Sequence, residues 1–285
     1  MSNSSNIILN RIFSQSVLAS LASNKENCPY ITVIRRYTQN PEGKTNLTLI
    51  SEIYHYLQTA YRNEYFYKNT LLNQLLTHCK KHSVKNTIAL TEIPVARSKA
   101  DFILINGKAE VYEIKTELDN FDRLATQIND YFCAFDHVSV VTCSDNLAKI
   151  RSILKDSMVG IYFLDKNSDL KLDKASAKYT ERLNHNALFK ILRKYEYENI
   201  ILKFYNQLPD VSDFVYYKNC LELFKKINIT KLYKAFLNEL KKRSTIEEEQ
   251  YLLIPEPLKS LIYFANPKKA ELEKINTFLN SKFRG

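Results

Sequence analysis

The 285-residue sequence has no tryptophan and few residues that break regular structure, with only 4 glycines and 7 prolines. This scarcity excludes collagen-like, low-complexity and long-linker architectures. No apolar run approaches the ~20 residues that a membrane-spanning helix needs. Arg11 is followed by IFSQSVLASLAS, which Ser and Gln interrupt and which has no basic start, so no signal peptide is predicted. We expect no membrane partner and a cytoplasmic location.

Cysteine is present but unpatterned, without C-x-x-C spacing or a histidine at zinc-finger spacing; the five positions are Cys28, Cys79, Cys133, Cys143 and Cys220. This excludes a disulfide framework or a zinc site and agrees with a reducing compartment. The phosphate-binding pattern G-x-x-x-x-G-K-[ST] is also absent, so any ATP-driven motor would be a separate chain.

What the sequence does have is positive charge. Lys+Arg exceed Asp+Glu by 41 to 31, and most of the excess lies C-terminal to Lys166. Such a balance favours a polyanionic partner, nucleic acid first. The alternative is an ordinary lysine-rich surface.

The stretch from Ser98 to Tyr131 is typical of strand, turn, strand and helix. The apolar run 102–105 favours a strand, and Asn106-Gly107 predicts a two-residue turn that reverses the chain into a strand over 110–116. With two residues in the turn, Asp101 and Glu113 are not directly opposed, but they lie near the same end of the two strands.

In the second strand, Glu113 and Lys115 share one face, while Ile114 points into the opposite, buried layer. The plain interpretation is an exposed Glu and Lys on a half-buried strand. Asp101 on the neighbouring strand favours a cation site instead, because clustered carboxylates repel unless a cation or a proton joins them. Two carboxylates and a lysine suit Mg²⁺, which takes few protein ligands and keeps several waters.

Asp101 followed by Glu113-Ile114-Lys115 resembles the signature of the PD-(D/E)xK nuclease superfamily. Gln127 and Tyr131 resemble the Gln-x-x-x-Tyr motif of its RecB-like exonuclease branch, and residues 61–142 resemble an uncharacterised bacterial family of this type. Ala100 stands where the signature has proline, which leaves the predicted metal ligands untouched.

The resemblance implies site roles. Asp101, Glu113 and the Ile114 backbone carbonyl would hold Mg²⁺, with Mn²⁺ as a substitute. Lys115 would orient the attacking water or stabilise the transition state, and Gln127 would reach the metal cluster or the substrate phosphate.

The resemblance also implies an acidic residue on the helix before the sheet, as a catalytic residue and metal ligand. Glu64 is the candidate, with Glu92 and Glu52 as rivals; alternatively, Glu64 forms a surface pair with Lys68. Tyr131 is either a core aromatic residue or a nucleic-acid contact.

Basic residues at four places are candidate phosphate contacts or ordinary solvated charges. Arg97 and Lys99 flank the start of the Asp101 strand, and the other three groups lie at ends of predicted helices; they are Lys225-Lys226, Lys241-Lys242-Arg243 and Lys268-Lys269.

The predicted fold class is α/β: a restriction-endonuclease-like mixed sheet flanked by helices. We expect an N-terminal helical segment over 1–46 with one strand at Tyr30–Val33, a nuclease-like core over 47–175, and a C-terminal all-helical region over 176–285.

These features predict a metal-dependent nuclease that hydrolyses phosphodiester bonds, with DNA the favoured partner. The alternatives are an inactive nucleic-acid-binding or protein-docking module on the same fold, and an RNA-directed defence or toxin nuclease. A homodimer and a separate partner protein are both compatible with the sequence.

Overall fold

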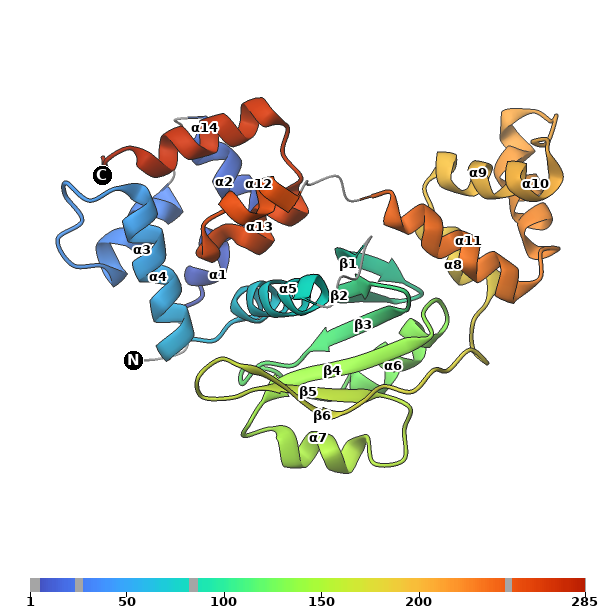
Figure 1. Cartoon of the computed structure of the whole chain (residues 1–285), viewed down its shortest axis with the longest axis horizontal. Coiled ribbons are helices and arrows are strands. Elements are labelled where there is room, and N and C mark those ends of the chain that lie inside the picture. Colours follow the sequence, from blue (N-terminus) through green and yellow to red (C-terminus); the bar gives the residue numbers. More distant parts are fainter. Residues whose placement is uncertain (1–5, 24–27, 82–86, 244–247, 285) are drawn as a thin grey trace. The chain divides into compact units, whose positions relative to one another are not determined.

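The computed structural model of the chain describes residues 6–23, 28–81, 87–243 and 248–284 (Figure 1). Packing divides the chain into two compact units, residues 1–77 with 246–285 and residues 78–245. The predicted boundaries near residues 47 and 176 do not coincide with these units. The reason is that the helices at the two ends of the chain pack with each other, whereas helices between 185 and 241 share a core with the sheet.

The first unit is helical within its described residues. Its elements are α1 Leu9–Ile12, α2 Gln15–Ala22, α3 Cys28–Tyr37, α4 Asn46–Ala60, α5 Glu64–Lys81, α12 Glu248–Leu253, the 3₁₀ turn η2 Glu256–Leu258, α13 Lys259–Ala265 and α14 Lys269–Asn280. α14 packs on α2 and α4, and the Asn46 amide donates to the Phe278 and Ser281 carbonyls. The strand predicted at Tyr30–Val33 is wrong. Tyr30, Val33 and Ile34 are buried at helical spacing, so this segment forms α3.

The second unit contains the sheet. Its elements are β1 Ile88–Val95, β2 Ser98–Ile105, β3 Ala109–Ile114, α6 Leu124–Phe132, β4 His137–Cys143, α7 Leu147–Ile153, β5 Gly160–Leu164, β6 Leu170–Lys174, α8 His185–Ile191, α9 Lys194–Tyr205, α10 Asp213–Lys225 and α11 Ile229–Lys241. The strands lie in chain order. β1–β2–β3 are antiparallel, β3–β4–β5 are parallel, and β6 returns antiparallel to β5. The predicted mixed α/β sheet is confirmed at this level.

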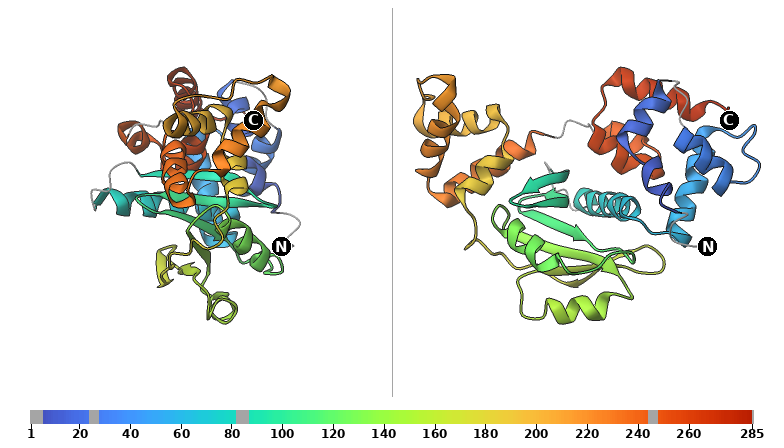
Figure 2. Two further views of the ribbon diagram at one scale, coloured as in Figure 1. Left: turned by 90° about the vertical axis from the view of Figure 1, so that its right-hand side faces the viewer. Right: turned by 180° about the vertical axis from the view of Figure 1, so that it is seen from behind.

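One face of the sheet shares an apolar core with α6, α7 and α8–α11. α6 packs against β2 and β4, and α8 packs against β1 (Figure 2). The predicted C-terminal helical region is therefore not one body, because its first part, through α11, belongs to the unit that contains the sheet. None of the helices in the described ranges combines the length and apolarity needed to cross a bilayer.

The opposite face of β3 carries a buried carboxylate, Glu110, which is 2% exposed. Lys108 Nζ lies 2.7 Å away, and the Ser139 and Ser176 hydroxyls donate to it at 2.6 and 2.7 Å. Burial alone would raise the pKa of Glu110, but these three donors outweigh burial and lower it below the ordinary value of 4.5. The cluster ties the segment after β6 to the centre of the sheet.

Acid is therefore expected to weaken the second unit through Glu110. A carboxyl whose folded pKa is lowered stabilises the fold above its unfolded pKa, and this contribution disappears as the pH falls through the folded pKa. Below about pH 4.5 the free energy of unfolding should fall more steeply in the wild type than in Glu110→Gln. Urea unfolding from pH 7 to pH 3 checks this, with Glu222→Gln on the surface as the control. Parallel curves for wild type and Glu110→Gln would contradict it.

Candidate functional site

The β2–β3 hairpin sets the register of the predicted site. Ile105 pairs with Ala109 and Phe102 with Tyr112, so three residues, 106–108, form the turn. Continued by one residue beyond its last pair, this register would bring position 101 across from position 113. The predicted two-residue turn is wrong, because Gly107 takes a positive φ of 106° while Asn106 does not. The two-residue turn would have offset positions 101 and 113 by one residue, whereas the observed three-residue turn removes that offset.

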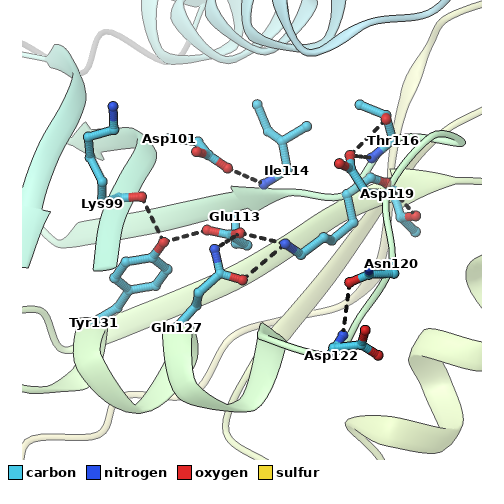
Figure 3. A network of polar contacts seen from close by, with 12 residues as sticks. Lys99, Asp101, Glu113, Ile114, Thr116, Asp119, Asn120, Asp122, Gln127 and Tyr131 are labelled. Carbon is cyan, nitrogen blue, oxygen red and sulfur yellow. Dashed lines mark hydrogen bonds and ion pairs between the residues drawn. The ribbon is translucent and has the colours of Figure 1, made fainter. Parts of the chain in front are cut away.

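Glu113 is buried rather than exposed, with only 1% of its surface accessible. Its Oε1 accepts from the Gln127 amide and lies 2.9 Å from Lys115 Nζ (Figure 3). Its Oε2 accepts from the Tyr131 hydroxyl at 2.5 Å. Lys115 Nζ also donates to Gln127 Oε1 at 3.0 Å. The ordinary-surface interpretation is therefore wrong, and the structure brings these four predicted residues into one network.

Gln127 and Tyr131 of this network lie on α6. Leu124, Ile128 and Phe132 are buried in the core at i, i+4 and i+8, which fixes the rotation of the helix about its axis. Gln127 and Tyr131 are themselves i and i+4, so both side chains reach β3 from one helix face (Figure 3). The Gln-x-x-x-Tyr motif and the buried residues of α6 thus have the same i, i+4 spacing.

Asp101 lies where β2 and β3 stop pairing. Its Oδ2 accepts from the Ile114 amide at 2.9 Å (Figure 3), in place of the backbone carbonyl that a continued ladder would supply. Because the amide and carbonyl of a strand residue point to the same side, the Ile114 carbonyl is directed toward the same gap. A carboxylate and a carbonyl oxygen therefore converge at the open end of the hairpin.

Glu92 on β1 lies next to Asp101. The β1–β2 register pairs Thr91 with Phe102 and Ile93 with Ala100, which leaves Glu92 across from Asp101. Carboxylate oxygens of the two residues lie within 4.8 Å of each other. Glu92 has a φ of 56°, and such left-handed strain costs roughly 1–3 kcal/mol and is common at functional sites. Sequence reasoning placed Glu92 only as a rival ligand, because its register with Asp101 was not visible.

The Tyr131 hydroxyl bridges two strands. It lies 2.9 Å from the Lys99 carbonyl oxygen on β2 and 2.5 Å from Glu113 Oε2 on β3. Burial, reinforced by the charges of Glu113 and Asp101, raises the pKa of Tyr131 above 10.0, so the hydroxyl keeps its proton. Tyr131 therefore keeps one hydrogen that it can donate either to the Lys99 carbonyl or to the Glu113 carboxylate.

The neighbouring Asp130 was missed by the sequence interpretation. It is 8% exposed, and its Oδ2 accepts from the Ser98 hydroxyl at 2.7 Å and the Arg97 amide at 3.3 Å. It therefore holds the β1–β2 turn against α6, next to the Tyr131–Lys99 contact.

The basic candidates divide into exposed and buried residues. Arg97 is exposed, and the Lys99 ammonium forms an ion pair with Glu92. Lys241 is half-buried, and Lys242 pairs with Glu239 at 2.6 Å. As phosphate contacts, these four remain predictions.

The structure corrects the prediction that Arg243 contacts a phosphate. Its side chain is 7% exposed and lies 2.6 Å from Glu196, which is 1% exposed. A guanidinium enclosed in this way cannot reach a phosphate on the surface, so the predicted contact is wrong for this residue.

Glu64 and Glu52 belong to the first unit. Glu64 begins α5 and forms the alternative pair with Lys68 at 2.6 Å. Glu52 pairs with Lys44 at 2.7 Å. The metal role of Glu64 stays a prediction.

The sheet and this network define an α/β protein with a buried carboxylate–lysine site. Residues 58–257 match the family described as Bacteriophage P4 protein cII. The match covers more than half of the chain and every predicted site residue except the rival Glu52 and Lys268-Lys269, and the chain belongs to this family. It is similar to protein cII of Enterobacteria phage P4, with 22% identity over 177 residues, 61% of this chain and 66% of the phage protein. The aligned region thus spans slightly less than two thirds of that relative. No solved structure matches the chain.

Proposed function

We propose that the second unit is a nuclease that hydrolyses phosphodiester bonds with Mg²⁺, DNA being the favoured substrate. The observation that carries the proposal is the Glu113–Lys115 pair, which is buried and held at 2.9 Å, while Asp101 contacts the amide of the intervening residue, Ile114. Burying two charges costs stability even when they are paired, and strained or costly arrangements are often retained for function. The resemblance of these residues to the PD-(D/E)xK signature supports the same reaction.

The donor set fits Mg²⁺. Asp101, Glu113 and the Ile114 carbonyl offer the hard oxygen ligands that this ion prefers, and Mn²⁺ accepts the same donors. Glu92, across from Asp101 and ion-paired with Lys99, would be a further ligand from the same unit. The bound ion would offset charge on the phosphate and lower the pKa of a water.

The chain's own side chains have separate tasks. Lys115 would orient the attacking water or stabilise the negative charge that develops on the phosphate, as a point charge on a flexible stem can. Gln127 contacts both Glu113 and Lys115 and would keep them in register. The Tyr131 hydroxyl would position Glu113 Oε2, which it contacts at 2.5 Å.

A second candidate keeps the fold without the chemistry. Both oxygens of Glu113 already have partners in Gln127, Lys115 and Tyr131, as a purely structural anchor would. On that reading the unit is a nucleic-acid-binding or protein-docking module, alone or as a homodimer. Fold alone does not decide between the two.

Cleavage of DNA in the presence of Mg²⁺ or Mn²⁺ tests the proposal. Supercoiled plasmid, single-stranded DNA and structured RNA are incubated with wild type, with Lys115→Ala and with the surface control Lys171→Ala. We expect metal-dependent cutting that Lys115→Ala slows by roughly 10²-fold or more and Lys171→Ala leaves intact, with folding confirmed by circular dichroism. Cutting of RNA alone would reassign the substrate. No cutting of any substrate would favour the binding module.

A further inference from the structure

α10 exposes aromatic rings to solvent. Phe214 is 97% exposed and Tyr217 51%, and Val211 just before the helix is 41% exposed. Phe214 lies three and four residues before Tyr217 and Lys218, so all three share one helix face. Val211, Phe214, Tyr217 and Lys218 are called here the α10 stripe. A nearly fully exposed phenylalanine has no role in the packing of its own unit.

The base of the stripe is rigid. The Tyr217 ring contacts Phe189 of α8 and Tyr197 of α9, with centroids 5.1 and 6.2 Å apart. Phe189 is itself 1% exposed. Tyr217 is therefore held on one side while its other side faces solvent, so little ordering remains to be done when a flat group stacks on it.

The α8–α11 region that carries the stripe has a net positive charge, because residues 185–243 contain 12 Lys+Arg and 6 Asp+Glu. Three acidic residues of α9–α11 pair with basic neighbours, as Glu196–Arg243, Glu222–Lys225 and Glu239–Lys242. Glu198 accepts from the Tyr216 hydroxyl, and Asp210 and Asp213 are exposed beside the stripe. Across the described residues, no carboxylate pairs with six exposed lysines of α8–α11 and their connections; these are Lys190, Lys203, Lys218, Lys226, Lys231 and Lys234. The surface therefore attracts a polyanion.

We propose that the α10 stripe binds single-stranded nucleic acid, with bases stacked on Phe214 and Tyr217 and the backbone near Lys218. Single-strand sites combine aromatic platforms with a positive surface that follows the phosphates. An apolar partner such as a second copy of the chain would cover the aromatic rings but would supply no negative charge for the lysines. The inference rests on the proposed function in taking nucleic acid as the polyanion.

Fluorescence anisotropy with a labelled oligo-dT of about 16 nucleotides tests the stripe. The measurement is made in EDTA, so that binding is separated from cleavage. We expect Phe214→Ala to weaken binding by roughly tenfold or more, and Phe214→Tyr, which keeps the ring, to bind like wild type. Lys218→Gln should lower the salt dependence by about one phosphate contact. Leu253→Ala, at an 85% exposed leucine of the first unit, is the matched control.

Unchanged affinity in Phe214→Ala would overturn the proposal, and folding is not at risk because the ring is exposed. A wild type that ignores oligo-dT but sediments as a dimer, which Phe214→Ala converts to a monomer, would overturn it in favour of a second copy. Cleavage by a protein whose stripe variants bind normally would leave the nuclease proposal standing while this one fails. Binding through the stripe without cleavage would support this proposal and contradict the nuclease proposal.

Discussion

Replacing Glu113 by glutamine is expected to abolish metal-dependent cleavage and to destabilise the second unit by about 3–5 kcal/mol. Glutamine keeps the shape and still accepts from Tyr131, but it removes the charge that faces Lys115 at 2.9 Å. Lys115 is 9% exposed, so its ammonium would be left buried beside a neutral amide. Breaking a buried pair costs more than the pair contributes, because one charge remains uncompensated.

Urea unfolding and Mn²⁺ binding by titration calorimetry measure the two effects separately. The double variant Glu113→Gln, Lys115→Met removes both charges and should recover part of the lost stability while still binding no metal. Glu113→Gln that binds Mn²⁺ as tightly as wild type would show that this carboxylate is not a ligand. A single variant as stable as wild type would show that the pair is not coupled.

Local patterns were enough to place the parts of this network. The alternation along β3 put Glu113 and Lys115 on one face, and the i, i+4 spacing put Gln127 and Tyr131 together. Both are properties of a single element. The hairpin itself was also predictable, because an apolar run ends at Asn-Gly. The residues that meet at the site were thus largely available from the sequence.

The register was not available from the sequence. The register depended on whether Lys108 belongs to the strand or to the turn. This one residue decides which position of β3 comes across from Asp101. The same limit hid Glu92, whose place across from Asp101 needs the β1–β2 register. Errors of one residue within a turn become errors of facing pairs in a sheet.

Long-range packing was the second limit. Helices near both ends of the chain form one unit, and no local pattern reports which distant helix a buried stripe contacts. Lys241-Lys242-Arg243 illustrates this, since the three side chains look alike in sequence. Only the partner, Glu196, which lies 47 residues earlier, separates Arg243 from its neighbours.

Arg243→Ala is accordingly expected to destabilise the second unit by about 3–5 kcal/mol, whereas Lys242→Ala should cost about 0–1 kcal/mol. Arg243 Nε and Nη2 donate to the two oxygens of Glu196 at 2.7 and 2.6 Å, and Nη2 also donates to the Ile191 carbonyl at 2.8 Å. Removing the guanidinium leaves a carboxylate that is 1% exposed without its charged partner. Arg243→Lys should recover little of the loss, because an ammonium cannot make the same forked contact.

The control makes the result specific to burial. Lys242 is adjacent and forms its own ion pair with Glu239, whose side chain is 9% exposed, but the Lys242 side chain is 61% exposed, so solvent reaches the pair. When Lys242 is removed, Glu239 still accepts from the Asn199 amide at 3.1 Å. Urea unfolding of the three variants measures the difference, and oligo-dT anisotropy at two salt concentrations accompanies it. A stable Arg243→Ala that loses affinity and salt dependence would restore the phosphate contact that the sequence suggested. Loss of stability with unchanged affinity per folded molecule would establish that this arginine joins the end of α11 to α9 and does not contact a phosphate.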